Sequence, residues 1–149
     1  MEIELHQANT LMAKLYEIEE YESMNVSNEL DIERLIKAKE FFIQNMNYWG
    51  QKKAELKSAV IRAEAQYQFT RADEKVKFMD SGSNATKAEA EASSSINFMN
   101  AKNHYADVSG KFEEAKANHD LCNKRIDAIQ QHISVLQKEV NRKQFIDGK

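Results

Sequence analysis

Proline is absent from the 149 residues, and glycine occurs only four times. Average usage would give roughly seven prolines at this length. Because proline breaks helix interiors and glycine weakens them, their scarcity permits very long helices. Apolar residues still make up 42% of the chain, so it has enough apolar surface to pack, and we do not expect disorder.

Long apolar runs, excess positive charge and paired cysteines are also missing. No apolar run approaches the roughly 18 residues of a membrane-spanning helix, and the polar N-terminus MEIELHQANT is unlike a signal peptide. The formal net charge of −3 contrasts with that of typical nucleic-acid-binding domains. Cys122 is the single cysteine, which favours a reducing compartment. We therefore expect a cytoplasmic protein of one domain, with no contact to a membrane.

A heptad repeat fills the second half of the chain. Residues seven apart are Phe98, Tyr105, Phe112, His119, Ile126, Ile133 and Val140. A second row three positions later comprises Ala101, Val108, Ala115, Cys122, Ile129 and Leu136. This a/d pattern over six repeats requires a long partner helix to bury it. It predicts a packing seam built mainly from Phe98, Tyr105, Phe112, Ile126, Ile129, Ile133 and Leu136.

The partner helix is predicted in the first half of the chain. There a spacing of four and three runs through Leu35, Lys39, Phe42, Met46, Trp49, Lys53, Leu56, Val60, Ala63, Tyr67 and Thr70. We expect a helix over 5–22, a long helix over 29–79, a turn over 80–85 and a second long helix over 86–142. Thr86 and Glu89 have the spacing of a capping box, which opens that last helix. The predicted fold is all-α: a long antiparallel, coiled-coil-like helical hairpin with a short N-terminal helix.

Further apolar residues fall outside the predicted seam. They are Ile36, Phe41, Ile43, Tyr48, Ile61, Phe69, Leu121 and Val135. On a lone two-helix hairpin these side chains would form exposed apolar patches. The sequence therefore predicts a homo-oligomer.

Motifs of enzymes and metal sites are lacking. The chain has no glycine-rich phosphate loop, no Cys-x-x-Cys and no His-Glu-x-x-His. His119 and Cys122 are spaced for a shared metal on a helix, but two ligands do not make a structural zinc site, and both lie on the seam. We expect a protein without catalytic activity, metal or cofactor.

Basic residues that follow aromatic ones suggest a nucleic-acid surface. Single-strand binders combine such positive charge with rings that stack on bases. The candidate contacts are Lys52, Lys53, Lys57, Arg62, Arg71, Lys124 and Arg125. The same pattern arises where seam aromatics are flanked by solvated lysines, and acidic residues such as Glu55 and Glu64 lie between the basic ones.

Residues 57–149 also resemble the UvsY-like family of phage-type recombination mediators. The similarity involves the Arg62…Tyr67…Arg71 stretch, Lys87-Ala88-Glu89-Ala90, the segment Asp120–Ile129 and the ending Phe145–Lys149. It implies a small helical protein that forms rings in the cytoplasm of an infected host, binds single-stranded DNA and helps a RecA-like recombinase displace single-strand-binding protein. The matching positions Lys87, Lys124 and Arg125 would contact DNA.

Three functional hypotheses follow. The first is a non-enzymatic recombination mediator, with single-stranded DNA, a recombinase and single-strand-binding protein as partners. The second is a protein-binding helical module, such as a phage inhibitor of a host defence complex that mimics nucleic acid with its acidic faces. The third is a coiled-coil scaffold.

Overall fold

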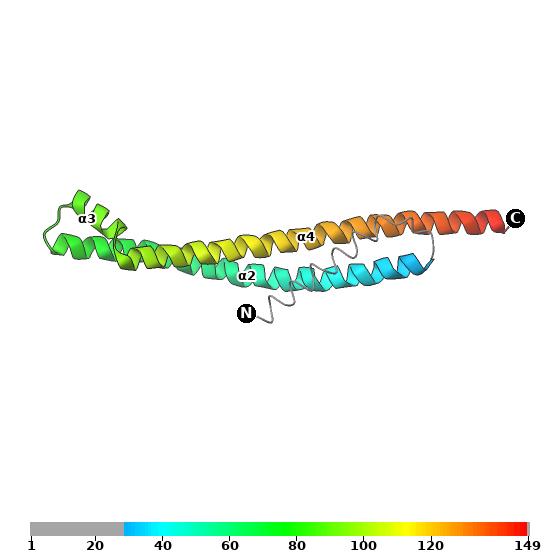
Figure 1. Cartoon of the computed structure of the whole chain (residues 1–149), viewed down its shortest axis with the longest axis horizontal. Helices are drawn as coiled ribbons and strands as arrows, with labels where there is room; N and C mark the ends of the chain where they lie inside the picture. The colour runs from blue at the N-terminus through cyan, green and yellow to red at the C-terminus, as the bar shows by residue number, and fades with distance from the viewer. Residues whose placement is uncertain (1–28, 149) are drawn as a thin grey trace. The chain divides into compact units, whose positions relative to one another are not determined.

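The computed structural model of the chain describes residues 29–148. Helices account for 94% of these residues, and no strand occurs among them. They are α2 (Glu29–Asp80), α3 (Ala85–Ser93) and α4 (Ile96–Asp147), shown in Figure 1. The predicted all-α class is confirmed, whereas the helix predicted over 5–22 lies outside the described residues.

A glycine-based cap ends α2. Gly82 has a φ of +99°, a conformation that residues with a side chain rarely adopt. Its N–H donates to the carbonyl of Met79 at 3.0 Å, while the N–H of Ser83 donates to that of Phe78 at 3.1 Å. These two bonds form a Schellman motif, which satisfies carbonyls that the helix end leaves open. The reversal falls inside the turn that the sequence predicts.

The prediction of a single helix over 86–142 is wrong, because the structure divides that segment into α3 and α4. The side chain of Asn84 caps α3 by accepting the N–H of Lys87 at 2.9 Å, so the cap precedes the predicted Thr86. Ser94 ends α3. The Ser95 hydroxyl then accepts the N–H of Phe98 at 3.2 Å and so caps α4. Serine side chains compete for backbone hydrogen bonds, which explains a break at three consecutive serines.

The chain forms two compact units. The second unit is Gln44–Asn123, and the first unit combines the residues before and after it. Both α2 and α4 contribute to each unit. In the first unit the Lys39 ammonium donates a hydrogen bond from α2 to the side-chain oxygen of Gln130 on α4. In the second unit α3 folds back over the end of α2 (Figure 1).

Within the second unit, α2 and α4 run antiparallel. The ring of Tyr67 stacks on that of Tyr105 with centroids 5.4 Å apart, and it also contacts Phe98. Seven residues later on α2, Glu74 contacts Asn97, which lies eight residues earlier on α4. Contacts that advance along one helix therefore recede along the other.

Every position of the two predicted heptad rows is buried or half-buried. Among the seven residues predicted to build most of the seam, Phe98, Ile129, Ile133 and Leu136 are buried, and Tyr105, Phe112 and Ile126 are half-buried. The same holds for the predicted positions on α2, of which Phe42 and Ala63 are fully covered. The heptad rows thus coincide with the faces on which the helices pack.

Candidate nucleic-acid interface and apolar face

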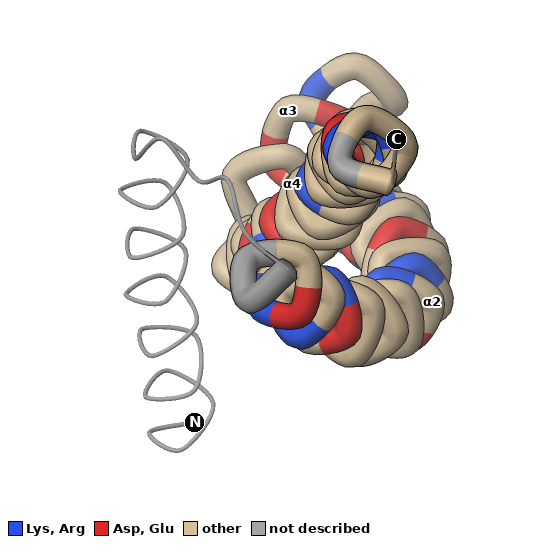
Figure 2. The backbone as a smooth tube through the Cα atoms, turned by 90° about the vertical axis from the view of Figure 1, so that its right-hand side faces the viewer, with Lys and Arg blue, Asp and Glu red and all other residues tan. Residues whose placement is uncertain are grey.

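The eight basic side chains predicted to contact DNA lie on three helices. Five are on α2, Lys87 is on α3, and Lys124 and Arg125 are on α4. Figure 2 shows Lys/Arg and Asp/Glu interspersed on the helices. Because carboxylates neutralise neighbouring cations, the environment of each basic group decides whether it can meet a phosphate.

Arg71 is engaged in an ion-pair cluster between α2 and α3. Its guanidinium lies 2.5 Å from one carboxylate oxygen of Glu89, and the Lys75 ammonium lies 2.7 Å from the other. Lys75 first, and then Arg71, lower the pKa of the Glu89 carboxyl from its usual range. The cluster holds α3 against α2, so the structure gives Arg71 a structural role.

Lys52, Lys53 and Lys87 also have partners within the protein. The Lys52 ammonium lies 3.8 Å from the Glu55 carboxylate, and Lys87 lies 3.8 Å from Glu91. The half-buried Lys53 turns toward α4, with its Nζ 3.5 Å from Nδ1 of His119. Of these groups, Lys53 is the least available to an external ligand.

Lys57, Arg62 and Lys124 are different, because they are exposed and form no ion pair with any residue in 29–148. Lys57 and Arg62 are five positions apart on α2, which places them about 140° apart around the helix. Arg125 on α4 is half-buried. Within the second unit, the structure therefore does not bring the candidates on α2 together into one basic face.

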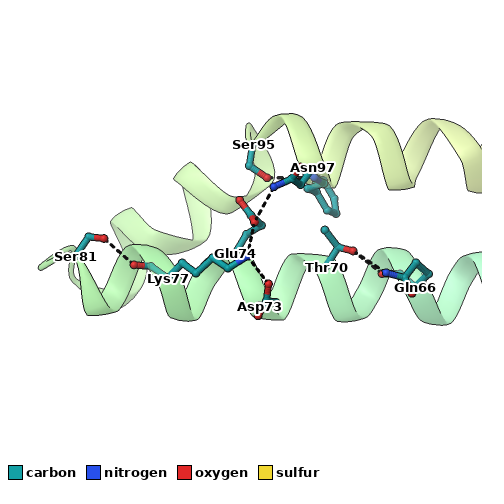
Figure 3. A network of polar contacts seen from close by, with 9 residues as sticks. Gln66, Thr70, Asp73, Glu74, Lys77, Ser81, Ser95 and Asn97 are labelled. Carbon is teal, nitrogen blue, oxygen red and sulfur yellow. Dashed lines mark hydrogen bonds and ion pairs between the residues drawn. The ribbon is translucent and has the colours of Figure 1, made fainter.

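A buried carboxylate, which the sequence reasoning missed, connects α2 to the start of α4. Glu74 is only 7% exposed, and its Oε1 accepts hydrogen bonds from Asn97 and Lys77, both at 3.1 Å (Figure 3). The bond from Asn97, followed by that from Lys77, lowers the pKa of Glu74. Asp73 and then Glu74 raise the pKa of Lys77 in turn. Glu74 lies four positions after Thr70, so the heptad spacing was an available signal for its burial.

The histidine and cysteine on the α4 seam serve packing. Cys122 is 7% exposed, and burial raises the pKa of its thiol. His119 approaches Lys53 and lies 3.4 Å from Asp120. Within the described part of the chain, no cluster of three His, Cys, Asp or Glu side chains is arranged to hold a metal.

An apolar face runs along α2 in the second unit. Its large side chains are well exposed: Ile61 (59%), Phe69 (66%), Val76 (56%) and Met79 (45%). Exposed small residues continue the same line at spacings of three and four: Ala54, Ser58, Ala65 and Ala72. We call these eight residues the outer stripe.

The outer stripe lies nearly opposite the face that packs on α4. Phe69 is two positions from Tyr67, and Ile61 is two positions from the buried Ala63, and two positions turn a helix by about 200°. Ile61 and Phe69 are among the apolar residues that the sequence places outside the seam. The whole stripe is harder to detect in the sequence, because alanines and a serine occupy half of its positions.

None of the described helices has an apolar stretch long enough to cross a membrane. No protein-family model, no curated protein and no solved structure matches the chain.

Proposed function

We propose that the protein is a non-enzymatic helical scaffold that works as a homo-oligomer. The observation that carries this proposal is the outer stripe. An apolar row with heptad-like spacing on a long helix is normally buried by a second helix. In the second unit the outer stripe faces away from α4, so α4 does not bury it.

The energetics are compatible with self-association. Burying a large apolar side chain fully contributes about 1.5–3 kcal/mol. The four large stripe residues are roughly half exposed, so two copies of them could add on the order of 8 kcal/mol. Association itself costs about 4–15 kcal/mol. The gain exceeds only the lower end of this cost, so the stripe by itself would support weak association at best, with a Kd of about 1 mM, and its population would rise with protein concentration.

Sedimentation velocity of the full chain over a wide concentration range tests the proposal. We expect a concentration-dependent shift from the mass of one chain, 17.2 kDa, to a defined multiple of it. A single species of one chain's mass up to millimolar concentration would refute the scaffold.

A second candidate function is the single-stranded-DNA-binding recombination mediator. Exposed Lys57, Arg62 and Lys124, which lack carboxylate partners among the described residues, favour it. Repetition of these groups around an oligomer would convert weak phosphate contacts into useful affinity. A mediator of this kind would bind a recombinase and single-strand-binding protein as well.

Fluorescence anisotropy with a labelled single-stranded oligonucleotide at low and physiological salt tests the DNA hypothesis. Lys57→Ala with Arg62→Ala should weaken binding and reduce the salt slope by about one unit for each phosphate that is no longer neutralised. Lys111→Ala is the control, because Lys111 is paired with Asp107 at 2.9 Å and should matter less. Absence of binding at low salt would exclude the mediator hypothesis and leave the scaffold intact.

A further inference from the structure

The middle of the outer stripe is symmetric about a point between Gln68 and Phe69. Ala65 and Ala72 lie equally far from this point on either side. The same is true of Ile61 with Val76, and of Ser58 with Met79. The two inner pairs match in kind, small with small and β-branched with β-branched. The outer pair sets the small Ser58 against the large Met79, Phe69 lies next to the centre, and Ala54 has no counterpart on α2.

We propose that the outer stripe packs against the outer stripe of a second copy of this chain, antiparallel, about a two-fold axis at Gln68–Phe69. This inference rests on the proposed scaffold function and assigns its interface. A two-fold contact uses the same patch on both copies, so each residue meets its mirror mate. Ile61 then meets the partner's Val76, and Ala65 meets the partner's Ala72.

The charges along the two edges of the stripe match this arrangement. In an antiparallel two-fold pair, each edge of one helix faces the same edge of the other. On one edge Arg62 faces the partner's Asp73, and on the other edge Glu64 faces the partner's Lys75. Each pair occurs twice, so four opposite-charge contacts flank the centre. Within one chain Asp73 already lies 2.6 Å from Lys77, and Lys75 lies 2.7 Å from Glu89, so the contacts between copies would extend existing ion-pair clusters. Pairs of this kind select orientation more than they add affinity.

The edge charges also favour the antiparallel over the parallel arrangement. In a parallel pair, each edge of one helix faces the opposite edge of its partner, so Lys57 would face the partner's Arg62 and Lys75 would face the partner's Asp80. The parallel pair thus has one repulsive and one attractive kind of contact, whereas the antiparallel pair has two attractive kinds. The antiparallel pair has a like-charge contact too, between Glu55 and the partner's Asp80. That contact lies at the ends, where solvent screens it.

Phe69→Glu tests the face, because it places a charge at the centre of the contact in both copies. We expect the dissociation constant of the full chain to rise by at least about 100-fold in sedimentation equilibrium. Val135→Glu is the control, since Val135 is similarly exposed (53%) but lies on α4. An oligomer that survives Phe69→Glu refutes this interface and leaves the scaffold standing, whereas a monomeric parent protein refutes the scaffold itself.

Disulfide trapping tests the orientation in a Cys122→Ala background. Ser58→Cys and Met79→Cys proteins, mixed and oxidised, should form a crosslinked pair containing one chain of each. Neither should crosslink alone, because like positions lie 21 residues apart along the pair, or about 30 Å. Rapid crosslinking of the Ser58→Cys protein by itself would show a parallel pair and overturn the proposal.

A charge exchange tests the edge contacts. Arg62→Asp should raise the dissociation constant by roughly fivefold or more, since it sets two like-charge contacts against the partner's Asp73. Adding Asp73→Arg to the same chain should restore most of the parent affinity. If the double variant is weaker than the single one, the two residues do not face each other and the alignment is wrong.

Discussion

The two units fill their interiors with side chains of different size. Among residues 29–148, the buried apolar residues of the first unit are all large: Phe42, Ile129, Ile133 and Leu136. Five of the seven in the second unit are alanine or cysteine: Ala63, Ala88, Ala92, Ala115 and Cys122. Since stabilisation grows with the apolar area removed from water, each buried position contributes more in the first unit.

The second unit compensates with other kinds of contact. It has the Glu74 centre, the ion pairs of Glu89 with α2 and the aromatic contacts of Tyr67. It also has large apolar groups, but several of them, including Phe69 and Ile61, lie on its outside. One heptad pattern can therefore bury large side chains in one part of a helix pair and small ones in another.

The largest loss of stability should come from truncating a buried side chain in the first unit. Ile129 is 1% exposed, so Ile129→Ala should lower the free energy of unfolding by about 2–5 kcal/mol. Urea denaturation followed by circular dichroism measures the change. Val135→Ala, at an exposed α4 position of the same unit, should cost less than about 0.5 kcal/mol. Equal destabilisation by both variants would mean that Ile129 is not a core residue.

Overfilling the second unit's core should have a smaller effect. Ala115 is 1% exposed, and Ala115→Leu should destabilise by about 1–3 kcal/mol, because the helices must separate to admit the larger side chain. Ala117→Leu is the matched control two positions away, where the side chain is exposed. Stabilisation by Ala115→Leu would contradict tight packing by small residues.

Replacing a glycine inside a helix should change the stability by a smaller amount again. Gly110 lies inside α4 with nothing within 4 Å of an added Cβ, so Gly110→Ala should stabilise by about 0.5–1 kcal/mol. Gly82→Ala should do the reverse, since the φ of +99° strains a residue with a side chain. The melting temperature of each variant measures the effect. Shifts in the same direction for both variants would contradict these opposite roles.

The smallest expected effect is a pH dependence located in the second unit. The pKa values of Glu74 and Glu89 are lowered from 4.5 in the folded protein, so the folded state holds their protons more weakly than the unfolded state. Their stabilisation is present above pH 4.5 and is lost as the pH falls through the folded pKa values. Glu74→Gln should reduce the drop in melting temperature on acidification, whereas Glu114→Gln at an exposed position should not.

The sequence was sufficient for the class of fold and for the packing faces, because a heptad repeats one local rule many times. It failed at the break between α3 and α4. The three serines at 93–95 are compatible with a continuous helix, and the helix ends there because their side chains compete for backbone hydrogen bonds. It also failed for Arg71, whose carboxylate partner Glu89 reaches it only because α3 folds back. The basic residues were visible in the sequence, but their neutralisation depends on tertiary contacts.

The contact between Glu74 and Asn97 favours one register of α4 against α2. Sliding α4 along α2 by one heptad would again place apolar rows face to face, so the seam alone distinguishes poorly between registers. Such a slip moves Asn97 by about 10 Å and leaves the Glu74 carboxylate without its amide donor. Glu74 would keep the hydrogen bond from Lys77, which lies on the same helix, but would lose the one from α4, and a buried carboxylate that loses a hydrogen bond is destabilised. This polar contact therefore favours the observed register over a slip by one heptad, which the apolar rows alone would tolerate.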